Sequence, residues 1–498
     1  MLWGIDIHSA DHVTEELYVP TRSPPKTEPI GHFTMSHKNK LRIAAAAVCL
    51  SLLAGIGIWL CLPTSYESMV PSQAKAVLRI SPASPMLKAS AAKLKDWTGL
   101  DAQGLDGGKA VYLFITPNEY VALTASLSDA EAFSQSVEDL QKRHQATVLP
   151  ESDGLHWAWM QKGWLMAWNR RALLVLGPGV AKERDQLHQT LVQMSEGHDP
   201  FTSTSAYDQL LKQPGEAQLY AQVDAVPAPY NTLFRLNIPA DAPLDAVHVL
   251  ASLRTEQKQT SVTFTLTSDN EDIKQQLAQY EQQKGCIRIT PDATCMPLFF
   301  MATRTQGKDL VALLQSDATL RGLLMGLNQV VDATRMLGTA NGLLTLQITD
   351  FNADWQPTFS LQAENPTQGL LSDADYWMES AHKQHGVTLK PLSSTAYQLT
   401  NEKQSVCIGL HGQGADQRVF FSSPSLMHAG ESGIPYAAKA SAHDGVTAYF
   451  HIRMDQLRNQ PCMKGDNAAA TLITSLLPAS KSFTYEAKTG GRGTITIE

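Results

Sequence analysis

The chain is poor in cysteine, with six in 498 residues. No pair stands in a Cys-x-x-Cys or Cys/His spacing, so the sequence predicts no zinc site and no cofactor. Four cysteines follow the longest apolar run, and outside the cytoplasm they allow three disulfide connectivities. The pattern CIRITPDATC favours a bridge between Cys286 and Cys295, with Cys407 then pairing with Cys462. Free buried thiols are the alternative.

Positive charge is also scarce, because 40 basic residues face 48 acidic ones and leave a net charge of −8. Residues 1–42 hold five residues of each sign, so the acidic excess belongs to the rest of the chain. A nucleic-acid partner requires clustered lysine and arginine. The composition therefore argues against nucleic-acid binding.

Catalytic motifs are missing. GLDGGKA, from Gly104, lacks the first glycine and the hydroxyl residue of a phosphate-binding loop. AGESGIP, around Ser432, has the wrong glycine spacing for a nucleophile elbow. His382 and His385 share a helix face without a third metal ligand on that helix. A non-catalytic protein is favoured, and an enzyme whose residues meet only in the fold is the alternative.

One long apolar run is present, from Ile43 to Leu62. Twenty helical residues span about 30 Å, the thickness of the hydrocarbon core of a bilayer. Lys38, Lys40 and Arg42 precede the run, which predicts an N-in orientation and places the bulk of the chain in the periplasm. A cleaved signal usually has a shorter apolar region of about 7 to 15 residues. We therefore expect a single-pass anchor of the inner membrane at 43–62, after a cytoplasmic tail at 1–42 whose Pro-rich stretch 21–29 predicts disorder.

Similar segments recur in the same order in the two halves of the chain. AQLYAQVDAV, from Ala217, alternates apolar and polar residues as a strand does, and VTAYFHIRMD repeats the pattern from Val446. Four further pairs follow, beginning at Lys75 and Met296, Lys109 and Gly342, Ala122 and Thr358, and His248 and Lys481.

Amphipathic helices are expected between these strands. The stretch from Ala130 places Phe133, Val137 and Leu140 on one stripe, and the stretch from Asp373 does the same with Tyr376 and Met378. The sequence predicts the α+β class: two tandem copies of one domain at 66–284 and 285–498, each with antiparallel sheets covered by helices, preceded by one transmembrane helix.

The exported region opens with MVPSQAKAVLRIS, in which Val70, Pro71 and Ala74 form a Val/Ile-Pro-x-x-Ala motif. With the N-terminal run and the later ALTASLSDAEAFSQSVEDL, this region resembles a family of uncharacterised envelope proteins common in Bacteroidetes. The resemblance covers most of residues 66–498. It implies a fold and an envelope location, and it brings no activity.

HWAWMQKGWLMAWNRR, from His156, holds four of the nine tryptophans in a predicted hairpin that turns at 161–163. Cross-strand aromatic packing alone explains such a pattern. The alternative is an aromatic platform for a glycan or a peptide, with Arg170 and Arg171 at its edge. The candidate ligand-binding residues are Trp157, Trp159, Trp164, Trp168, Arg170 and Arg171.

These observations favour a membrane-anchored periplasmic binding or scaffolding protein, with an envelope protein or a glycan as its partner. An envelope hydrolase and a secretion-related chaperone are the alternatives. Convergent titratable groups with shifted pKa values would favour the enzyme, and large exposed apolar patches would favour the chaperone.

Overall fold

The computed structural model describes most of the chain after residue 65. The described residues are 66–82, 84, 103–226, 231–256, 259–291, 297–316, 321–322, 324–325, 328, 332–364, 374–383, 386–401, 404–412, 417–428, 431–432, 436–442, 445–464 and 480–498. The predicted tail at 1–42 and the predicted span at 43–62 lie outside this part. Within it, every helix is too short or too polar to cross a membrane.

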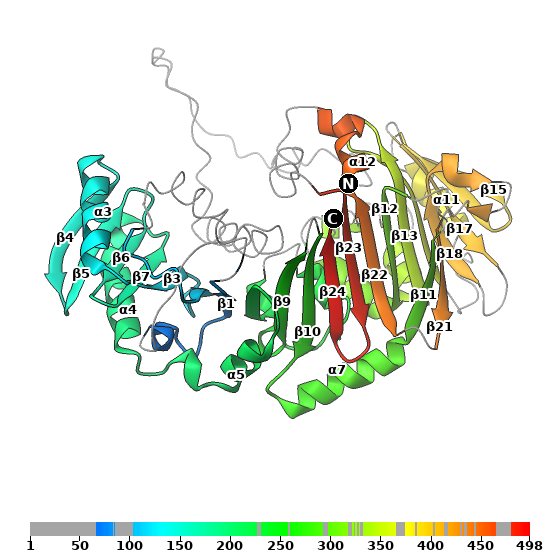
Figure 1. The fold of residues 1–498 in the computed structure, drawn as a ribbon. Coiled ribbons are helices and arrows are strands. Elements are labelled where there is room, and N and C mark those ends of the chain that lie inside the picture. Colours follow the sequence, from blue (N-terminus) through cyan, green and yellow to red (C-terminus); the bar gives the residue numbers. More distant parts are fainter. Residues whose placement is uncertain are drawn as a thin grey trace, which may run out of the picture.

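A single antiparallel sheet of 22 strands dominates the fold (Figure 1). Its central pair is β10 (Gln259–Thr267) and β24 (Arg492–Ile497), which run antiparallel from Thr260 opposite Ile497 to Thr265 opposite Arg492. We call this pair the junction, because it joins strands from the two halves of the chain.

Nine strands continue the sheet from β10. In order of pairing they are β9 (His248–Glu256), β8 (Ala217–Gln222), β1 (Ala76–Ile80), β2 (Val111–Ile115), β3 (Val121–Ser126), β7 (Ala172–Gly177), β6 (Leu165–Trp168), β5 (Leu155–Met160) and β4 (Ala146–Ser152).

Nine strands likewise continue from β24. In order they are β23 (Ser482–Lys488), β22 (Val446–Arg453), β12 (Phe299–Gln306), β13 (Asn341–Phe351), β14 (Pro357–Glu364), β18 (Arg418–Ser422), β17 (Ser405–His411), β16 (Ala396–Thr400) and β15 (Thr388–Ser393). β11 (Cys286–Pro291) and β21 (Tyr436–Ser441) pair with each other beside β22, and β19 (Met427–His428) and β20 (Glu431–Ser432) form a separate two-stranded sheet.

The predicted fold class is therefore wrong. We expected two separate α+β units, each with its own sheets, and the structure has one continuous and mainly antiparallel sheet. The reason is the pairing of β10 with β24, whose residues are more than 220 positions apart in sequence. Local alternation of apolar and polar residues identifies a strand but does not identify its distant neighbour.

The order of pairing is nevertheless the same on both sides of the junction. β8 and β22, which contain the segments from Ala217 and Val446, both lie two strands from the junction. The segments from Lys75 and Met296 form β1 and β12, each one strand further out.

Helices fill the connections between strands. They are α3 (Ala130–Lys142), α4 (Arg184–Glu196), α5 (Ser205–Lys212), α6 (Thr232–Arg235), α7 (Glu271–Lys284), α8 (Gly307–Ser316), α10 (Ala333–Gly338), α11 (Ala374–Lys383) and α12 (Met454–Arg458). In α3 the predicted stripe of Phe133, Val137 and Leu140 is buried. In α11 the prediction is wrong, because Trp377 and Ala381 are buried while Tyr376 is 68% exposed.

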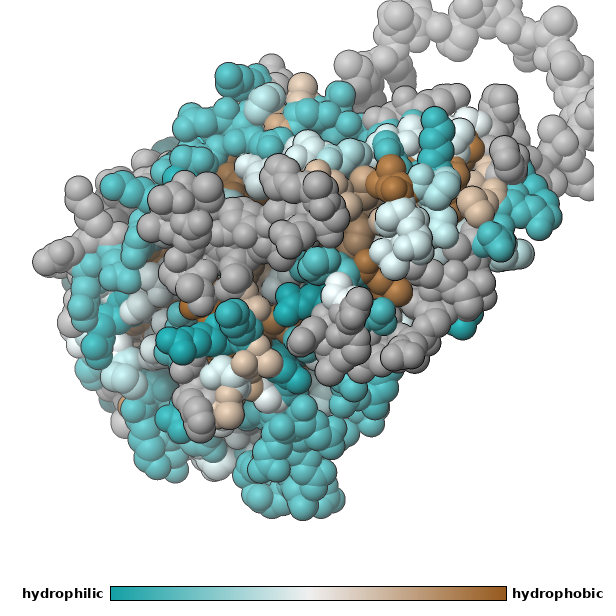
Figure 2. Space-filling model, turned by 90° about the vertical axis from the view of Figure 1, so that its right-hand side faces the viewer, coloured by the Kyte–Doolittle hydropathy of each residue, from teal (hydrophilic) through white to brown (hydrophobic). Residues whose placement is uncertain are grey.

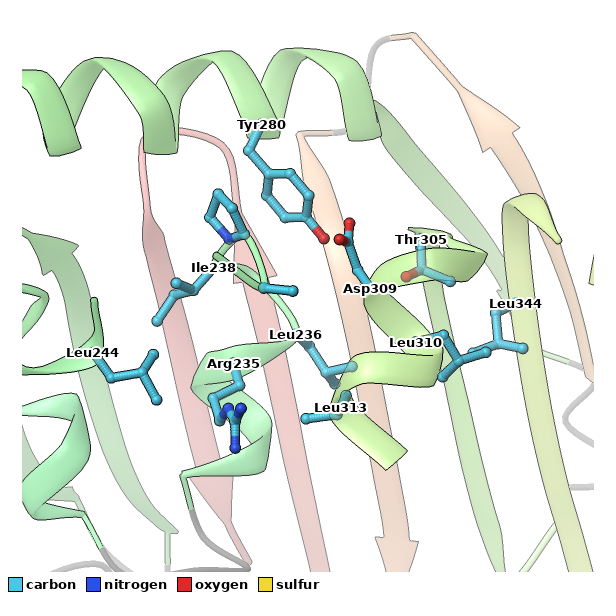
Figure 3. A pocket seen from close by; sticks show the side chains of 12 residues that line it. Arg235, Leu236, Ile238, Leu244, Tyr280, Thr305, Asp309, Leu310, Leu313 and Leu344 are labelled. Atoms are coloured by element: carbon cyan, nitrogen blue, oxygen red, sulfur yellow. The ribbon is translucent and has the colours of Figure 1, made fainter. Parts of the chain in front are cut away.

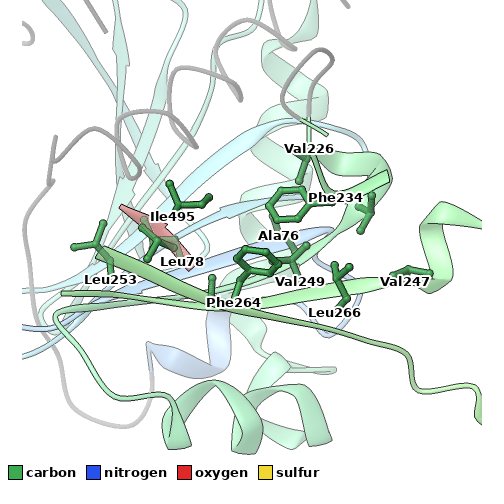
Figure 4. Close-up of a cluster of buried hydrophobic side chains, with 14 of the residues drawn as sticks. Ala76, Leu78, Val226, Phe234, Val247, Val249, Leu253, Phe264, Leu266 and Ile495 are labelled. Carbon is green, nitrogen blue, oxygen red and sulfur yellow. The ribbon is translucent and has the colours of Figure 1, made fainter. Parts of the chain in front are cut away.

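The core at the junction draws residues from both halves of the chain (Figure 4). Phe264 of β10 stacks on Tyr485 of β23, with 5.5 Å between ring centroids. Phe234 of α6 meets Phe264 edge-on at 5.3 Å. Because one apolar cluster contains side chains of β1, β8, β9, β10, β23 and β24, burial holds the two halves together in addition to the strand pairing.

The Val-Pro-x-x-Ala motif lies at the start of the described chain. Val70 and Ala74 are buried in a second apolar cluster. The neighbouring Glu67 accepts hydrogen bonds from the hydroxyls of Tyr66, Tyr112 and Tyr207, at 3.1, 3.0 and 2.7 Å. Burial of Val70 and Ala74 gives these two motif residues a packing role.

Candidate functional site

The helix α7 carries the side chains that build the candidate site. Its start is fixed by Asn270, whose Oδ1 accepts hydrogen bonds from the amides of Asp272 and Ile273 at 2.9 and 3.4 Å. Gly285, with φ of 70°, follows its end. Figure 1 shows α7 crossing below the ends of the strands at the junction.

The buried face of α7 is formed by Ile273, Tyr280 and Lys284. The last two are four residues apart, so they point to the same side of the helix. Lys284 is 6% exposed, and among the described lysines, arginines, aspartates and glutamates it alone is buried. A charged group rarely occupies such a position without a partner, which makes its surroundings informative.

Lys284 Nζ donates to two neutral oxygens. One is the backbone oxygen of Leu236, and the other is Oδ1 of Asn237 at 3.1 Å. The Asn237 amide is held in this orientation because its Nδ2 donates to the Tyr485 hydroxyl at 3.0 Å. The Thr447 hydroxyl also donates to Oδ1, at 3.3 Å. Residues of both halves of the chain therefore position the acceptor of the Lys284 amine.

Tyr280 lies one helical turn before Lys284. Figure 3 shows its hydroxyl facing the carboxylate of Asp309 from α8. Burial, with a smaller contribution from the Asp309 charge, raises the pKa of Tyr280 well above its ordinary value. Asp309 Oδ2 is buried and has no hydrogen-bond partner among the described residues.

Burial lowers the pKa of Lys284 to about 7, and the charges of Asp309 and Glu281 only partly oppose this effect. At neutral pH a large fraction of the amine is therefore uncharged, whereas an ordinary lysine has a pKa of about 10.4. An uncharged amine is both a hydrogen-bonding group and a nucleophile.

A cavity of about 240 Å³ lies between α7 and the ends of β10, β23 and β24, and we call it the α7 cavity. For comparison, an apolar cavity of about 150 Å³ is large enough to bind benzene. Its apolar wall contains Phe264, Leu266, Leu277, Ala278 and Ala487, and its polar lining includes Asn237, Thr267, Tyr280 and Thr447.

Basic residues outnumber acidic ones in the lining of the α7 cavity. Lys274, Lys284, Lys488 and Arg492 line it, against the single acid Glu281. The Glu281 carboxylate is already used, because its two oxygens accept hydrogen bonds from the amides of Gly490 and Gly491 at 2.6 and 3.3 Å.

The four cations differ in their partners. Lys274 contacts Glu271 at 2.6 Å, and Lys488 contacts Glu486 at 3.3 Å. Within the described part of the chain, Arg492 forms no ion pair. The lining thus combines an apolar wall with Arg492, a cation that no described acid neutralises, and this combination suits a small molecule that carries an anionic group.

The predicted tryptophan hairpin is confirmed, with β5 and β6 joined by a turn in which Gly163 donates to the Met160 carbonyl. Its tryptophans lie on opposite faces of the sheet. Trp157 is buried and Trp159 half-buried against one apolar cluster. Trp168 is buried and Trp164 half-buried against another.

Other contacts hold these rings in place. Trp157 stacks on His188 at 4.0 Å, and Trp168 meets Phe133 edge-on at 5.6 Å. Trp157 and Trp159 face Ala167 and Leu165 across the hairpin, so aromatic pairing between these strand positions does not explain them. The four rings do not form one platform, and ligand binding by Trp159 or Trp164 stays a prediction.

Arg170 and Arg171 are exposed in the turn between β6 and β7. Asn169 Oδ1 shapes this turn by accepting hydrogen bonds from the amides of Arg171 and Ala172 at 2.8 and 2.9 Å. None of the tryptophans or arginines predicted from the sequence lines the α7 cavity.

The cysteines form no disulfide bond within the described part of the chain. Cys407 carries a free thiol, so the predicted Cys407–Cys462 disulfide is not formed in this structure. Cys407 lies in β17, whereas Cys462 lies in a 3₁₀ helix at Pro461–Lys464. Cys295 is outside the described residues, and its pairing with Cys286 stays a prediction.

The sequence contained a signal for the α7 cavity that the motif search missed. Lys284 continues the apolar stripe of Ile273 and Tyr280, at spacings of seven and four residues. A lysine on such a stripe indicates either an amine that reaches solvent at the edge of the core or a buried amine with a functional role. The acceptors of its protons, Leu236 and Asn237, lie almost 50 residues earlier, and no local pattern predicts them.

Residues 86–464 match the family described as "Domain of unknown function (DUF4836)". This region is more than half of the chain, and the chain belongs to that family. No curated protein shows significant similarity to it.

Among solved structures, the chain is similar to crystal forms IV and III of TP0453. The form IV structure shares 15% identity with a TM-score of 0.28, and the similarity covers 40% of this chain and 78% of that chain. The form III structure shares 14% identity with a TM-score of 0.29, covering 45% of this chain and 89% of that one. Similarity this low supports no conclusion about fold or function.

Proposed function

We propose that this member of the DUF4836 family is a non-catalytic binding or scaffolding protein of the cell envelope, and that its α7 cavity binds a small anionic molecule. The observation that carries the proposal is the lining of that cavity. Arg492, which forms no ion pair among the described residues, lies beside an apolar wall, and Glu281, the one acid of the lining, is already engaged by two backbone amides. A bound anion gains charge-assisted hydrogen bonds there, while its apolar part is removed from water.

The envelope location rests on the sequence. The apolar run at 43–62 after three basic residues supports an inner-membrane anchor with the bulk of the chain in the periplasm. The resemblance to Bacteroidetes envelope proteins through Val70, Pro71 and Ala74 points to the same compartment. An envelope protein or a glycan bound at the tryptophan hairpin is a further partner in this proposal.

A titration of the full-length protein in detergent tests the cavity. The probe is pyridoxine 5′-phosphate, which has an aromatic ring for the apolar wall, a phosphate for the cations and no aldehyde. Calorimetry should give a one-site isotherm for the wild type. Loss of one charge-assisted hydrogen bond costs about 1.5 to 3 kcal/mol, so Arg492→Gln should raise the Kd at least about tenfold.

Arg170→Gln is the matched control, because Arg170 is an exposed arginine far along the sheet from the junction. We expect it to leave the Kd unchanged. If Arg170→Gln weakens binding and Arg492→Gln does not, the anion site is at the tryptophan hairpin. If the wild type binds no probe, the proposed site is wrong.

One observation favours an enzyme as the second candidate. Two titratable groups with shifted pKa values, Tyr280 and Lys284, line the same cavity. Such pairs concentrate at catalytic sites. A hydrolase additionally needs a group that activates water or serves as acyl acceptor, and the Lys284 amine is the candidate for that group.

A chaperone needs large exposed apolar patches, and the described surface offers little support for one. The exposed large apolar side chains come from separate elements: Val148, Leu211, Met325, Tyr376 and Leu392. Among the coloured residues on the face in Figure 2, which shows the end of the molecule with α11 and β15, hydrophilic ones predominate and hydrophobic ones form small groups between them. We therefore do not extend the proposal to chaperone activity.

A further inference from the structure

The hydrogen bonds of Lys284 match an uncharged amine. A neutral –NH₂ group has two N–H donors and one lone pair, whereas –NH₃⁺ has three donors and no lone pair. Two acceptors contact Nζ, the Leu236 carbonyl oxygen and Asn237 Oδ1, and both are neutral. With two N–H groups satisfied, the lone pair is the position that remains for a ligand.

The rest of the lysine is held rigidly. The Lys284 carbonyl accepts a hydrogen bond from Arg304 Nε at 2.7 Å, which ties the end of α7 to β12. Asn237 is fixed by Tyr485 and Thr447, as described above. The amine is therefore oriented before any ligand arrives, and orientation of this kind is what makes a nucleophile effective.

We propose that Lys284 forms an imine with the carbonyl carbon of an anionic aldehyde or ketone bound in the α7 cavity. This inference rests on the proposed function, since it specifies the chemical class of the anionic ligand. The lone pair of Nζ attacks the carbonyl carbon and a C–N bond forms. The carbonyl oxygen then leaves as water with the two amine protons, so no further reactant is needed.

One other feature of the cavity suits this ligand. Arg492 and Lys488 lie at the turn of the β23–β24 hairpin, where they offer positive charge to the anionic group.

Reductive trapping tests the inference. Full-length protein is incubated at pH 7 with pyridoxal 5′-phosphate, reduced with borohydride, digested, and mapped by mass spectrometry. An ordinary lysine is neutral in about one molecule in 2,500 at pH 7, whereas an amine with a pKa of about 7 is half neutral. We expect the adduct at Lys284 to form about 100-fold faster, or more, than at Lys274, an exposed lysine on the same helix.

Three comparisons make the result specific. Lys284→Arg should abolish the fast adduct, and Lys212→Arg, which changes an exposed lysine of α5 outside the cavity lining, should leave it unchanged. Pyridoxal, which lacks the phosphate, should be trapped at least tenfold more slowly, because it lacks the group that the cations hold. Mapping the adduct in the wild type needs no variant, so a misfolded Lys284→Arg protein does not prevent the test.

The outcomes separate the two proposals. Binding of pyridoxine 5′-phosphate without a fast adduct at Lys284 overturns the imine and leaves the anion-binding site in place. Equal trapping at Lys274 and Lys284 also overturns the imine. If neither compound binds, both proposals fail.

Discussion

Lys284 makes the free energy of unfolding increase as the pH rises above about 7. Its pKa in the folded protein, about 7, is below the ordinary value of 10.5. Between these values the unfolded chain binds more protons than the folded one, so stability rises with pH. Below pH 7 both states are protonated, and this contribution no longer changes.

Lys284→Met removes this contribution. Above pH 7 the free energy of unfolding of the wild type should rise, relative to that of Lys284→Met, by up to about 1.4 kcal/mol per pH unit. Urea titrations at intervals from pH 6 to pH 9 measure it, and the comparison cancels other titrating groups. A constant difference across this range would show that the Lys284 pKa is not lowered.

Single residues also show why the site was only partly predictable. Burial of Lys284 could be anticipated from its position on an apolar stripe, but its lowered pKa comes from the enclosing core, whose effect the charges of Asp309 and Glu281 only partly oppose. The tryptophans illustrate the reverse case. Their clustering was conspicuous in sequence, yet Trp157 and Trp168 fill two different apolar clusters.

The helix α7 is attached to the β23–β24 turn by Glu281. Its carboxylate accepts hydrogen bonds from the backbone amides of Gly490 and Gly491. These two glycines have positive φ angles of 79° and 65°. Residues with a Cβ adopt such backbone angles only at a cost in conformational free energy. The two glycines therefore allow the turn that presents both amides to Glu281. This contact closes one side of the α7 cavity.

Glu281→Ala should therefore destabilise the protein by about 1.5 kcal/mol, the lower end for hydrogen bonds to a charged group. The control is Glu271→Ala on the same helix. Glu271 forms an exposed ion pair with Lys274, and losing such a pair costs about 0.5 kcal/mol or less of folding free energy. Chemical unfolding monitored by tryptophan fluorescence compares the two. Equal effects would mean that Glu281 does not attach the helix to the turn.

Elements with strong local periodicity were the predictable part of the fold. The strands from Ala217 and Val446 and the helix from Ala130 are present as β8, β22 and α3. α11 was placed correctly, but its buried face was not, because Trp377 and Ala381 form a stripe as regular as the one expected from Tyr376. Periodicity identifies a helix better than it selects between two adjacent faces.

The sheet as a whole could not be predicted from local patterns. Two units with the same strand order would each leave a terminal strand unpaired, and such an edge exposes backbone donors and acceptors. Pairing β10 with β24 satisfies both edges at once and forms the junction. The α7 cavity lies at this junction, so it exists only when the two halves of the chain are joined.

Hydrogen–deuterium exchange of the full-length protein, with and without pyridoxine 5′-phosphate, tests this account most directly. We predict slower exchange in three segments that are distant in sequence and adjacent in the fold: Glu271–Lys284 of α7, the segment around Asn237, and the 488–492 turn. Exchange in the β5–β6 hairpin should stay the same. Protection confined to the hairpin, or no protection anywhere, would contradict a ligand-binding cavity at the junction.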